Sequence, residues 1–186
     1  MKKYFAIGLM LLSAAALHAE GQAIRSLIQP KGTASDLKLT ELKNKDDLLA
    51  KFSGQTWVTG TFVVRWPAGA GATADKTPDY VLVPDPASIS ILPHFRIVDP
   101  PFKNSYKVKD IEIQNGAVAL RLAFTEAAAK KILERKANSI RVTGRFLIES
   151  YEVGVECDAP WARASLVKAD LPDQLAVVHR KFEEGC

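Results

Sequence analysis

The chain has 186 residues, of which 47% are hydrophobic and 25% are charged, and its formal net charge is +4. This apolar content excludes a largely disordered protein, and the small net charge argues against a dedicated nucleic-acid binder. A chain of this length suits one domain that buries a hydrophobic core.

The first nineteen residues have the pattern of a secretory signal peptide. Lys2 and Lys3 precede the unbroken apolar run Tyr4–Leu12, and small residues then lead to Leu17-His18-Ala19. A charged start, a short apolar run and a small residue at the cut are typical of such leaders, and the run is too short for a signal anchor. Cleavage after Ala19 leaves 167 residues with a net charge of +2, and no later apolar run is long enough to span a membrane. We therefore expect export to the bacterial periplasm or beyond.

Cys157 and Cys186 are the two cysteines of the chain. In an oxidising compartment two cysteines usually form one disulfide. The bond would close a loop of 28 intervening residues and stabilise the fold by ~3–4 kcal/mol in the chain-entropy model. A reactive thiol is the weaker interpretation, because neither residue lies in a CxxC motif or beside a histidine.

Residues 20–54 are expected to form a lead-in to the main domain. The stretch 20–40 mixes charged and apolar positions without a clear period, which indicates ordered but irregular chain. Asp46–Phe52 is expected to be a short helix that Gly54 ends. Residues 55–186 then form a β-rich domain with a C-terminal helix at Leu175–Phe182, and both parts belong to one globular unit.

Strand patterns dominate after residue 55. β-branched and aromatic residues predict strands at Trp57–Val64, Tyr80–Val83, Ser88–Leu92, Ile140–Tyr151 and Trp161–Val167. The composition of Pro67–Pro78 indicates a loop. Three prolines exclude Pro93–Ser105 from the centre of a sheet.

A hairpin and a helix are expected between these strands. Because Asn-Gly is a strong turn signal, Tyr106–Ile113 and Ala117–Phe124 should pair around Gln114-Asn115-Gly116. Period-two spacing places four residues of the second arm on one face: Val118, Leu120, Leu122 and Phe124. The helix Glu126–Lys136 follows, with Thr125 as its N-cap.

Two strands share the pattern V-T-G-x-F followed by two apolar residues, at Val58–Val64 and Val142–Ile148. Glycine lets a strand bend or another backbone approach, which is how small barrels turn their corners. The residues expected to face inward are Val58, Gly60, Phe62, Val64, Val142, Gly144, Phe146 and Ile148.

With these two glycine strands and this order of elements, the chain resembles small secreted bacterial proteins with an OB-type barrel. The resemblance covers residues 55–168. It implies a mainly β, α+β fold: a five- to seven-stranded OB-like barrel or a strongly curved antiparallel sheet, with one helix between strands. The extra hairpin strand and the long 93–105 segment depart from that pattern, so a β-sandwich-like or mixed open sheet stays open.

The exported chain carries no recognisable catalytic motif. It has no G-x-S-x-G, H-E-x-x-H, P-loop or dinucleotide-binding turn. Of its two histidines, His94 lies near Ser88, Ser90 and Ser105, but nothing in their order indicates a triad, and His179 is expected at the surface. Neither the histidines nor the scattered carboxylates have metal-site spacing. We expect no catalytic residue, metal or cofactor; a hydrolase centred on His94 is the disfavoured alternative.

The charge is distributed unevenly along the sequence. Residues 20–95 are neutral overall, residues 96–148 carry +6 and residues 149–186 carry −4. Complementary potentials steer encounters between proteins, so this pattern favours a charged protein partner. The alternative is that the lysines of helix 126–136 only solvate its surface.

Two segments have the composition of a contact surface, namely Trp66–Asp79 and His94–Tyr106. The second combines aromatic and arginine anchors with a proline-stiffened backbone. The candidate partner-binding residues are Trp66, Asp79, His94, Phe95, Arg96, Phe102, Lys103 and Tyr106. The alternative for Phe95, Ile97 and Phe102 is core packing beneath a long loop, and Trp161 is expected to pack on the disulfide.

These observations predict an exported, non-enzymatic protein-binding module, and within that class an inhibitor or immunity-type protein that neutralises an effector or enzyme. The alternative is a periplasmic carrier of a small molecule or oligosaccharide, with an apolar pocket lined by Trp57 or Trp66 and by Tyr80. Neither nucleic-acid binding nor stable membrane insertion after signal removal is expected.

Secretion of the full chain from a bacterial host should yield a protein that begins at Glu20 and contains a Cys157–Cys186 disulfide. N-terminal sequencing checks the first point, and peptide mapping of a non-reduced digest checks the second. Retention of Met1, or recovery of both cysteines as free thiols, would contradict these expectations.

Overall fold

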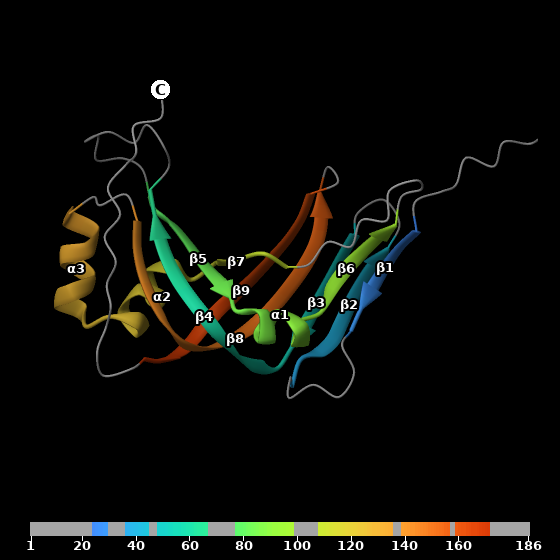
Figure 1. The fold of residues 1–186 in the computed structure, drawn as a ribbon, viewed down its shortest axis with the longest axis horizontal. Helices are drawn as coiled ribbons and strands as arrows, with labels where there is room; N and C mark the ends of the chain where they lie inside the picture. Colours follow the sequence, from blue (N-terminus) through green and yellow to red (C-terminus); the bar gives the residue numbers. More distant parts are fainter. Residues whose placement is uncertain are drawn as a thin grey trace, which may run out of the picture.

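The structure, a computed structural model, describes residues 24–29, 36–44, 48–66, 77–98, 108–135, 139–156 and 159–171. These ranges contain nine strands and three helices (Figure 1). In chain order they are β1 (Ile24–Ile28), β2 (Lys38–Asn44), β3 (Leu48–Ser53), β4 (Gln55–Arg65), β5 (Asp79–Pro84), α1 (Pro86–Ile91), β6 (His94–Val98), β7 (Ile111–Ile113), α2 (Gly116–Ala123), α3 (Glu126–Arg135), β8 (Ser139–Glu156) and β9 (Ala159–Asp170). The expected signal peptide, the C-terminal helix and both cysteines lie outside the described residues.

Seven strands form the main sheet, in the order β2-β3-β8-β4-β5-β7-β9. β8 also pairs with β9, so the pairings β8-β4-β5-β7-β9 return to the strand where they began. All of these neighbours are antiparallel except β7 and β9, which are parallel. The expected mainly β fold is confirmed and its few helices are consistent with the α+β class, but the parallel β7–β9 pair departs from a wholly antiparallel sheet.

The elements at the two ends of the molecule differ. Figure 1 shows β8 and β9 as long, strongly bent strands, with α2 and α3 at one end and β1 and β6 at the other. β1 and β6 form a separate two-stranded antiparallel sheet, in which His94 lies opposite Ile28. Pro93–Ser105 was expected to stay out of a central strand, and its described part, up to Val98, does so.

The two V-T-G-x-F segments are antiparallel neighbours in β4 and β8. Gly60 lies directly opposite Gly144. The predicted inward side chains are at most 1% exposed: Val58, Phe62, Val64, Val142, Phe146 and Ile148. A Cβ added at Gly60 would overlap the carbonyl oxygen of Val83, and one at Gly144 would lie 2.6 Å from Leu171 Cδ2. The close approach expected at these glycines is therefore confirmed.

The expectations for the lead-in are wrong. Part of the stretch 20–40 forms β1 and the start of β2, and the expected helix Asp46–Phe52 is instead β3 from residue 48 onward. Leu48, Ala50 and Phe52 are at most 3% exposed and alternate with more exposed neighbours, which is the period of a strand. β3 pairs with β2 on one side and β8 on the other, so tertiary pairing decides its conformation.

The strand expected at Ser88–Leu92 is also wrong, because these residues belong mostly to α1. The Asp85 side chain accepts a hydrogen bond from the Ser88 backbone N–H at 2.7 Å, and Pro86 occupies the first turn, where proline is tolerated. The Ser88 hydroxyl accepts a hydrogen bond from the Thr59 backbone N–H at 2.9 Å. α1 is therefore a capped turn fixed to β4.

The expected hairpin around Asn115-Gly116 is wrong, because only its first arm contains a strand. β7 is a short strand, but Gly116–Ala123 is α2, so Leu120 and Phe124 are buried while Val118 and Leu122 are 51% and 39% exposed. The Asn115 side chain bonds to β9: its Nδ2 donates to the Leu166 carbonyl at 2.8 Å, and its Oδ1 accepts from the Leu166 N–H at 2.9 Å. The asparagine thus extends the β7–β9 contact, and the chain continues as a helix.

The expected helix 126–136 is confirmed as α3, with Thr125 Oγ1 accepting from the Ala128 N–H at 3.3 Å. Two helices rather than one separate β7 from β8, because α2 replaces the second arm of the hairpin. The long strands expected at Trp57–Val64 and Ile140–Tyr151 are confirmed within β4 and β8. Those expected at Tyr80–Val83 and Trp161–Val167 are confirmed within β5 and β9.

Replacing Asn115 should destabilise the fold, because its side chain holds β7 to β9. Asn115→Asp keeps the size but turns the donor toward Leu166 O into a second acceptor, so we expect a loss of about 2–3 kcal/mol in the free energy of unfolding. Denaturant unfolding followed by circular dichroism measures this loss. Gln114→Ala, at an exposed neighbouring side chain, is the control and should change stability by less than about 0.5 kcal/mol. Equal stability of Asn115→Asp and the wild type would refute this role.

Candidate functional site

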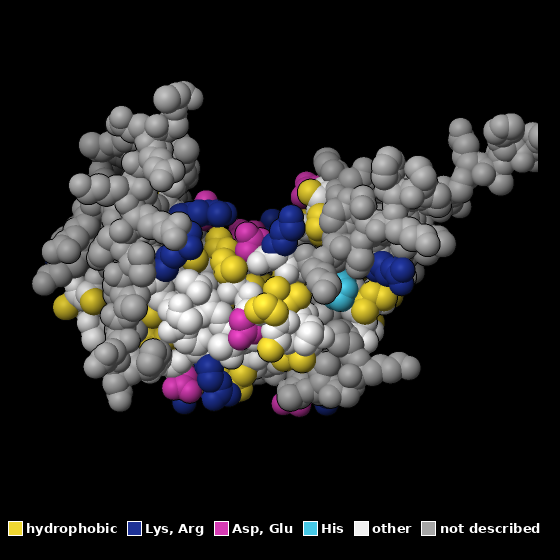
Figure 2. Space-filling model, in the orientation of Figure 1, with side chains coloured by type: hydrophobic (Ala, Val, Ile, Leu, Met, Phe, Trp, Pro, Cys, Tyr) yellow, Lys and Arg dark blue, Asp and Glu magenta, His cyan; other side chains and the backbone are white. Residues whose placement is uncertain are grey.

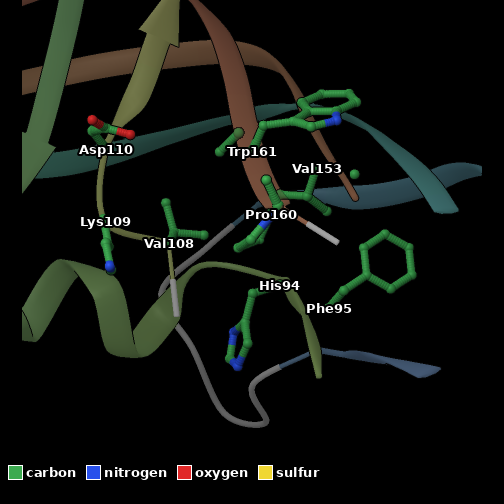
Figure 3. A pocket seen from close by; sticks show the side chains of 11 residues that line it. His94, Phe95, Val108, Lys109, Asp110, Val153, Pro160 and Trp161 are labelled. Atoms are coloured by element: carbon green, nitrogen blue, oxygen red, sulfur yellow. The ribbon is translucent and has the colours of Figure 1, made fainter. Parts of the chain in front are cut away.

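A cavity of about 350 Å³ lies between β6, the segment before β7, and the β8–β9 pair (Figure 3). Four buried side chains line it, each at most 9% exposed: Phe95, Val108, Val153 and Ala162. The polar and charged side chains of its lining are those of His94, Lys109 and Asp110, which lie at the rim. Pro160 and Trp161 also line it. An apolar interior with a few polar groups at the mouth is the usual composition of a binding pocket.

A second cavity, of about 560 Å³, adjoins the first. Both are lined by Asp110, Pro160, Trp161 and Ala162, so these residues form the boundary between them. The second cavity extends over the end of β4, the start of β5 and the end of β7, and its further lining includes Arg65, Asp79, Tyr80 and Glu112. We call the two cavities together the Trp161 groove.

Contacts on β8 and β7 fix Trp161 beside the groove. Its indole covers Gly154, where a Cβ would overlap the ring. The Arg163 guanidinium lies 4.6 Å from the ring centroid, and Arg163 Nε donates to Glu112 Oε2 at 2.9 Å. Trp161 was expected to pack on the disulfide; the contacts that the structure describes are with Gly154 and Arg163, whereas Cys157 lies outside the described residues.

The position of His94 depends on Tyr151. The Tyr151 hydroxyl is fully buried and donates to the Pro93 carbonyl at 2.9 Å, directly before His94. Burial raises the pKa of Tyr151 well above its usual range, because the phenolate would lose its hydration. His94 itself is half-buried, with Nδ1 3.2 Å from the Leu92 carbonyl oxygen.

The structure brings some of the predicted partner-binding residues to the groove. His94 and Phe95 line the first cavity and Asp79 lines the second, where its carboxylate lies 3.6 Å from Arg65 Nε. Phe95 is only 3% exposed and belongs to the core, as the alternative interpretation expected. Arg96 is exposed on β6, and Trp66 packs half-buried against the core. The remaining three, Phe102, Lys103 and Tyr106, lie outside the described residues.

Of the lining residues predicted for a carrier pocket, Trp57 or Trp66 and Tyr80, the described cavities contain only Tyr80. Tyr80 does line the second cavity, where burial raises its pKa. The tryptophan at the groove is Trp161; Trp57 lies on β4, with the Arg145 guanidinium 4.9 Å from its ring centroid. Trp66 does not appear in the described lining of either cavity.

Two ion pairs between described residues join the segments that differ in net charge along the sequence. Arg145 of the basic segment lies 3.6 Å from Asp170 of the acidic segment, and Glu112 pairs with Arg163. Basic and acidic side chains also lie next to each other on the face seen in Figure 2. At these places, side chains from the basic and the acidic segment therefore pair with each other.

Within the described ranges, no three His, Cys, Asp or Glu residues come close enough to hold a metal ion. His94 and Asp110 border the same cavity, but no hydrogen bond between described residues joins them. No helix in the described part of the chain has the length and apolar character needed to cross a membrane. Comparisons with protein-family models, curated proteins and solved structures find no match to this chain.

The centre of the site lies outside the surface predicted from the sequence. Val108, Asp110 and Trp161 did not belong to the predicted surface, because the cavities form only where β7 comes beside β9. A usable signal was the Trp161–Arg163 pair, since a tryptophan and an arginine two residues apart on a strand lie on the same face.

Tyr151→Phe tests how the buried hydroxyl fixes the chain before His94. At about pH 8 we expect the wild type to be more stable by about 1 kcal/mol, because the variant leaves the Pro93 carbonyl unpaired. Above about pH 10 the unfolded tyrosine ionises whereas folded Tyr151 keeps its proton, so the stability difference should shift by about 1.4 kcal/mol at pH 11, which cancels or slightly reverses the advantage of the wild type. Urea unfolding at both pH values measures the difference; a constant difference would contradict the raised pKa.

Proposed function

We propose that this protein is an exported, non-enzymatic protein-binding module, of inhibitor or immunity type, that receives part of its partner in the Trp161 groove. The observation that carries this proposal is the groove itself, two adjoining open cavities with a buried apolar lining and charged groups of both signs at the rim. An elongated open groove suits a polypeptide segment. Trp161, fixed between Gly154 and Arg163, has the character of an interface anchor.

The proposal includes an OB-type barrel made of β4, β5, β7, β8 and β9. In chain order α2 and α3 follow the third of these strands, and the third pairs in parallel with the fifth. OB folds bind ligands across their second and third strands, near the first–second and fourth–fifth connections. The second cavity lies over β5 and β7, the corresponding strands, and reaches the start of β9. This agreement supports both the fold and the binding surface.

The proposed function also includes export to the periplasm or beyond. The leader pattern at Met1–Ala19 supports export, and a partner would then be a periplasmic or secreted effector or enzyme. An inhibitor needs no reaction chemistry of its own, only a surface that covers a site on its target.

Site-specific photo-crosslinking in the source organism tests the protein-binding proposal. A benzoylphenylalanine in place of Lys109, an exposed residue at the rim of the first cavity, should give one discrete adduct with a partner protein. The same probe in place of Leu133, which is 43% exposed on α3, is the control and should give none. Mass spectrometry identifies the adduct. No adduct at Lys109, or the same adduct at both positions, would overturn the proposal.

A small-molecule or oligosaccharide carrier is the second candidate, and the first cavity favours it. Its volume of about 350 Å³ and its four buried apolar lining residues match the usual size and composition of small-molecule pockets. This candidate predicts that a library ligand raises the melting temperature of the wild type. Val108→Phe, which fills the cavity, should reduce that shift, and no adduct should form at Lys109.

A further inference from the structure

The two cavities of the Trp161 groove differ in chemistry. The first is floored by side chains that are almost fully buried, so an apolar side chain placed there would lose its contact with water. Such burial contributes about 1.5–3 kcal/mol for a large aliphatic or aromatic side chain. The first cavity is therefore suited to one bulky apolar group.

The second cavity is acidic. Among the described residues, its charged lining is one cation, Arg65, and three carboxylates, Asp79, Asp110 and Glu112. Two of these carboxylates already have partners, because Asp79 lies 3.6 Å from Arg65 and Glu112 accepts from Arg163. Among the described residues Asp110 has neither an ion pair nor a hydrogen bond, and it lies at the boundary between the cavities. Of the three described carboxylates, that of Asp110 is therefore the one available to a cation from a partner.

Lys109 makes the two cavities electrostatically different. It lines the first cavity but not the second, so a cation placed in the first cavity would meet a like charge there. Repulsion of the wrong arrangement contributes to specificity as much as attraction of the right one. An occupant that carries both an apolar and a basic group is therefore favoured in one orientation only.

We propose that the groove recognises an extended segment of its protein partner that presents a bulky apolar side chain to the first cavity and a lysine or arginine to Asp110. Alternate residues of an extended segment point the same way at a spacing of about 7 Å, so two residues separated by one position can each reach one of the cavities. This inference rests on the proposed protein-binding function and specifies the chemistry of the partner.

The test uses a positional-scanning library of hexapeptides against the full exported chain. We expect enrichment of an aromatic or large aliphatic residue with Lys or Arg two positions away. For the best peptide, Asp110→Asn should weaken binding by about two- to fivefold, the range of an exposed ion pair, and the loss should fade at high salt. The same peptide with glutamine at its basic position should bind both proteins equally.

Asp36→Asn is the matched control, since Asp36 is exposed, lines neither cavity and has no ion pair among the described residues. It should leave the affinity unchanged. Enrichment without a basic residue, an unchanged affinity in Asp110→Asn, or no enrichment at all would overturn this inference. The crosslinking at Lys109 decides the protein-binding function separately, so the two failures are distinguishable.

Discussion

The short parallel contact between β7 and β9 brings together two strands that contribute to the groove. Only Glu112 with Arg163, and Ile113 with Ala164, are paired there as strand residues. The Gln114 N–H then donates to the Ala164 carbonyl at 2.9 Å, and the Asn115 side chain adds two bonds to Leu166. Because the Asn115 amide supplies both a donor and an acceptor, it continues the ladder where the backbone turns into α2. The cycle of strand pairings depends on this contact.

The bend of β8 lets this strand contribute both to the sheet and to the site. Its register against β9 shifts between Glu149 and Glu152, where Ser150 has a positive φ of 51°. A bulge of this kind turns side chains toward a different face. Tyr151 follows it and points into the core, against the ring of Phe52 at 5.9 Å and the carbonyl of Pro93. One irregularity in β8 thus fixes the start of β6, and with it one wall of the first cavity.

The predictable part of this fold is the part that depends on local pattern. Alternation of β-branched residues around a central glycine identified β4 and β8, and even the direction of their side chains. The wrong secondary-structure predictions fall where residues typical of one local structure make a different contact in the fold. Asn115-Gly116 has turn chemistry, but the asparagine bonds to β9, and Gly116 is needed because a Cβ there would overlap the Tyr80 ring. β3 was mistaken for a helix because one of its two partners, β8, is remote in sequence and the other, β2, was not recognised as a strand.

The candidate site was harder to predict for the same physical reason. Its lining comes from six strands, β4 to β9, and from the segment before β7, and no single stretch of sequence carries the pattern of a pocket. The sequence did indicate the His94–Phe95 region, since an aromatic-rich, proline-stiffened segment suggests contact. It assigned Phe95 to the partner, whereas the structure uses this ring as part of the core.

The walls of the groove are fixed before any partner arrives. Glu112 and Arg163 bridge β7 and β9 on the side of Trp161, and Tyr151 holds the chain before His94 on the opposite wall. A site whose side chains are already ordered loses little conformational entropy on binding, so more of the contact energy appears as affinity. Lys109 and Asp110 lie on the segment before β7 and are exposed, so their charges are partly screened by water. Affinity should therefore come mainly from the buried apolar lining, and selectivity from the two charges at its rim.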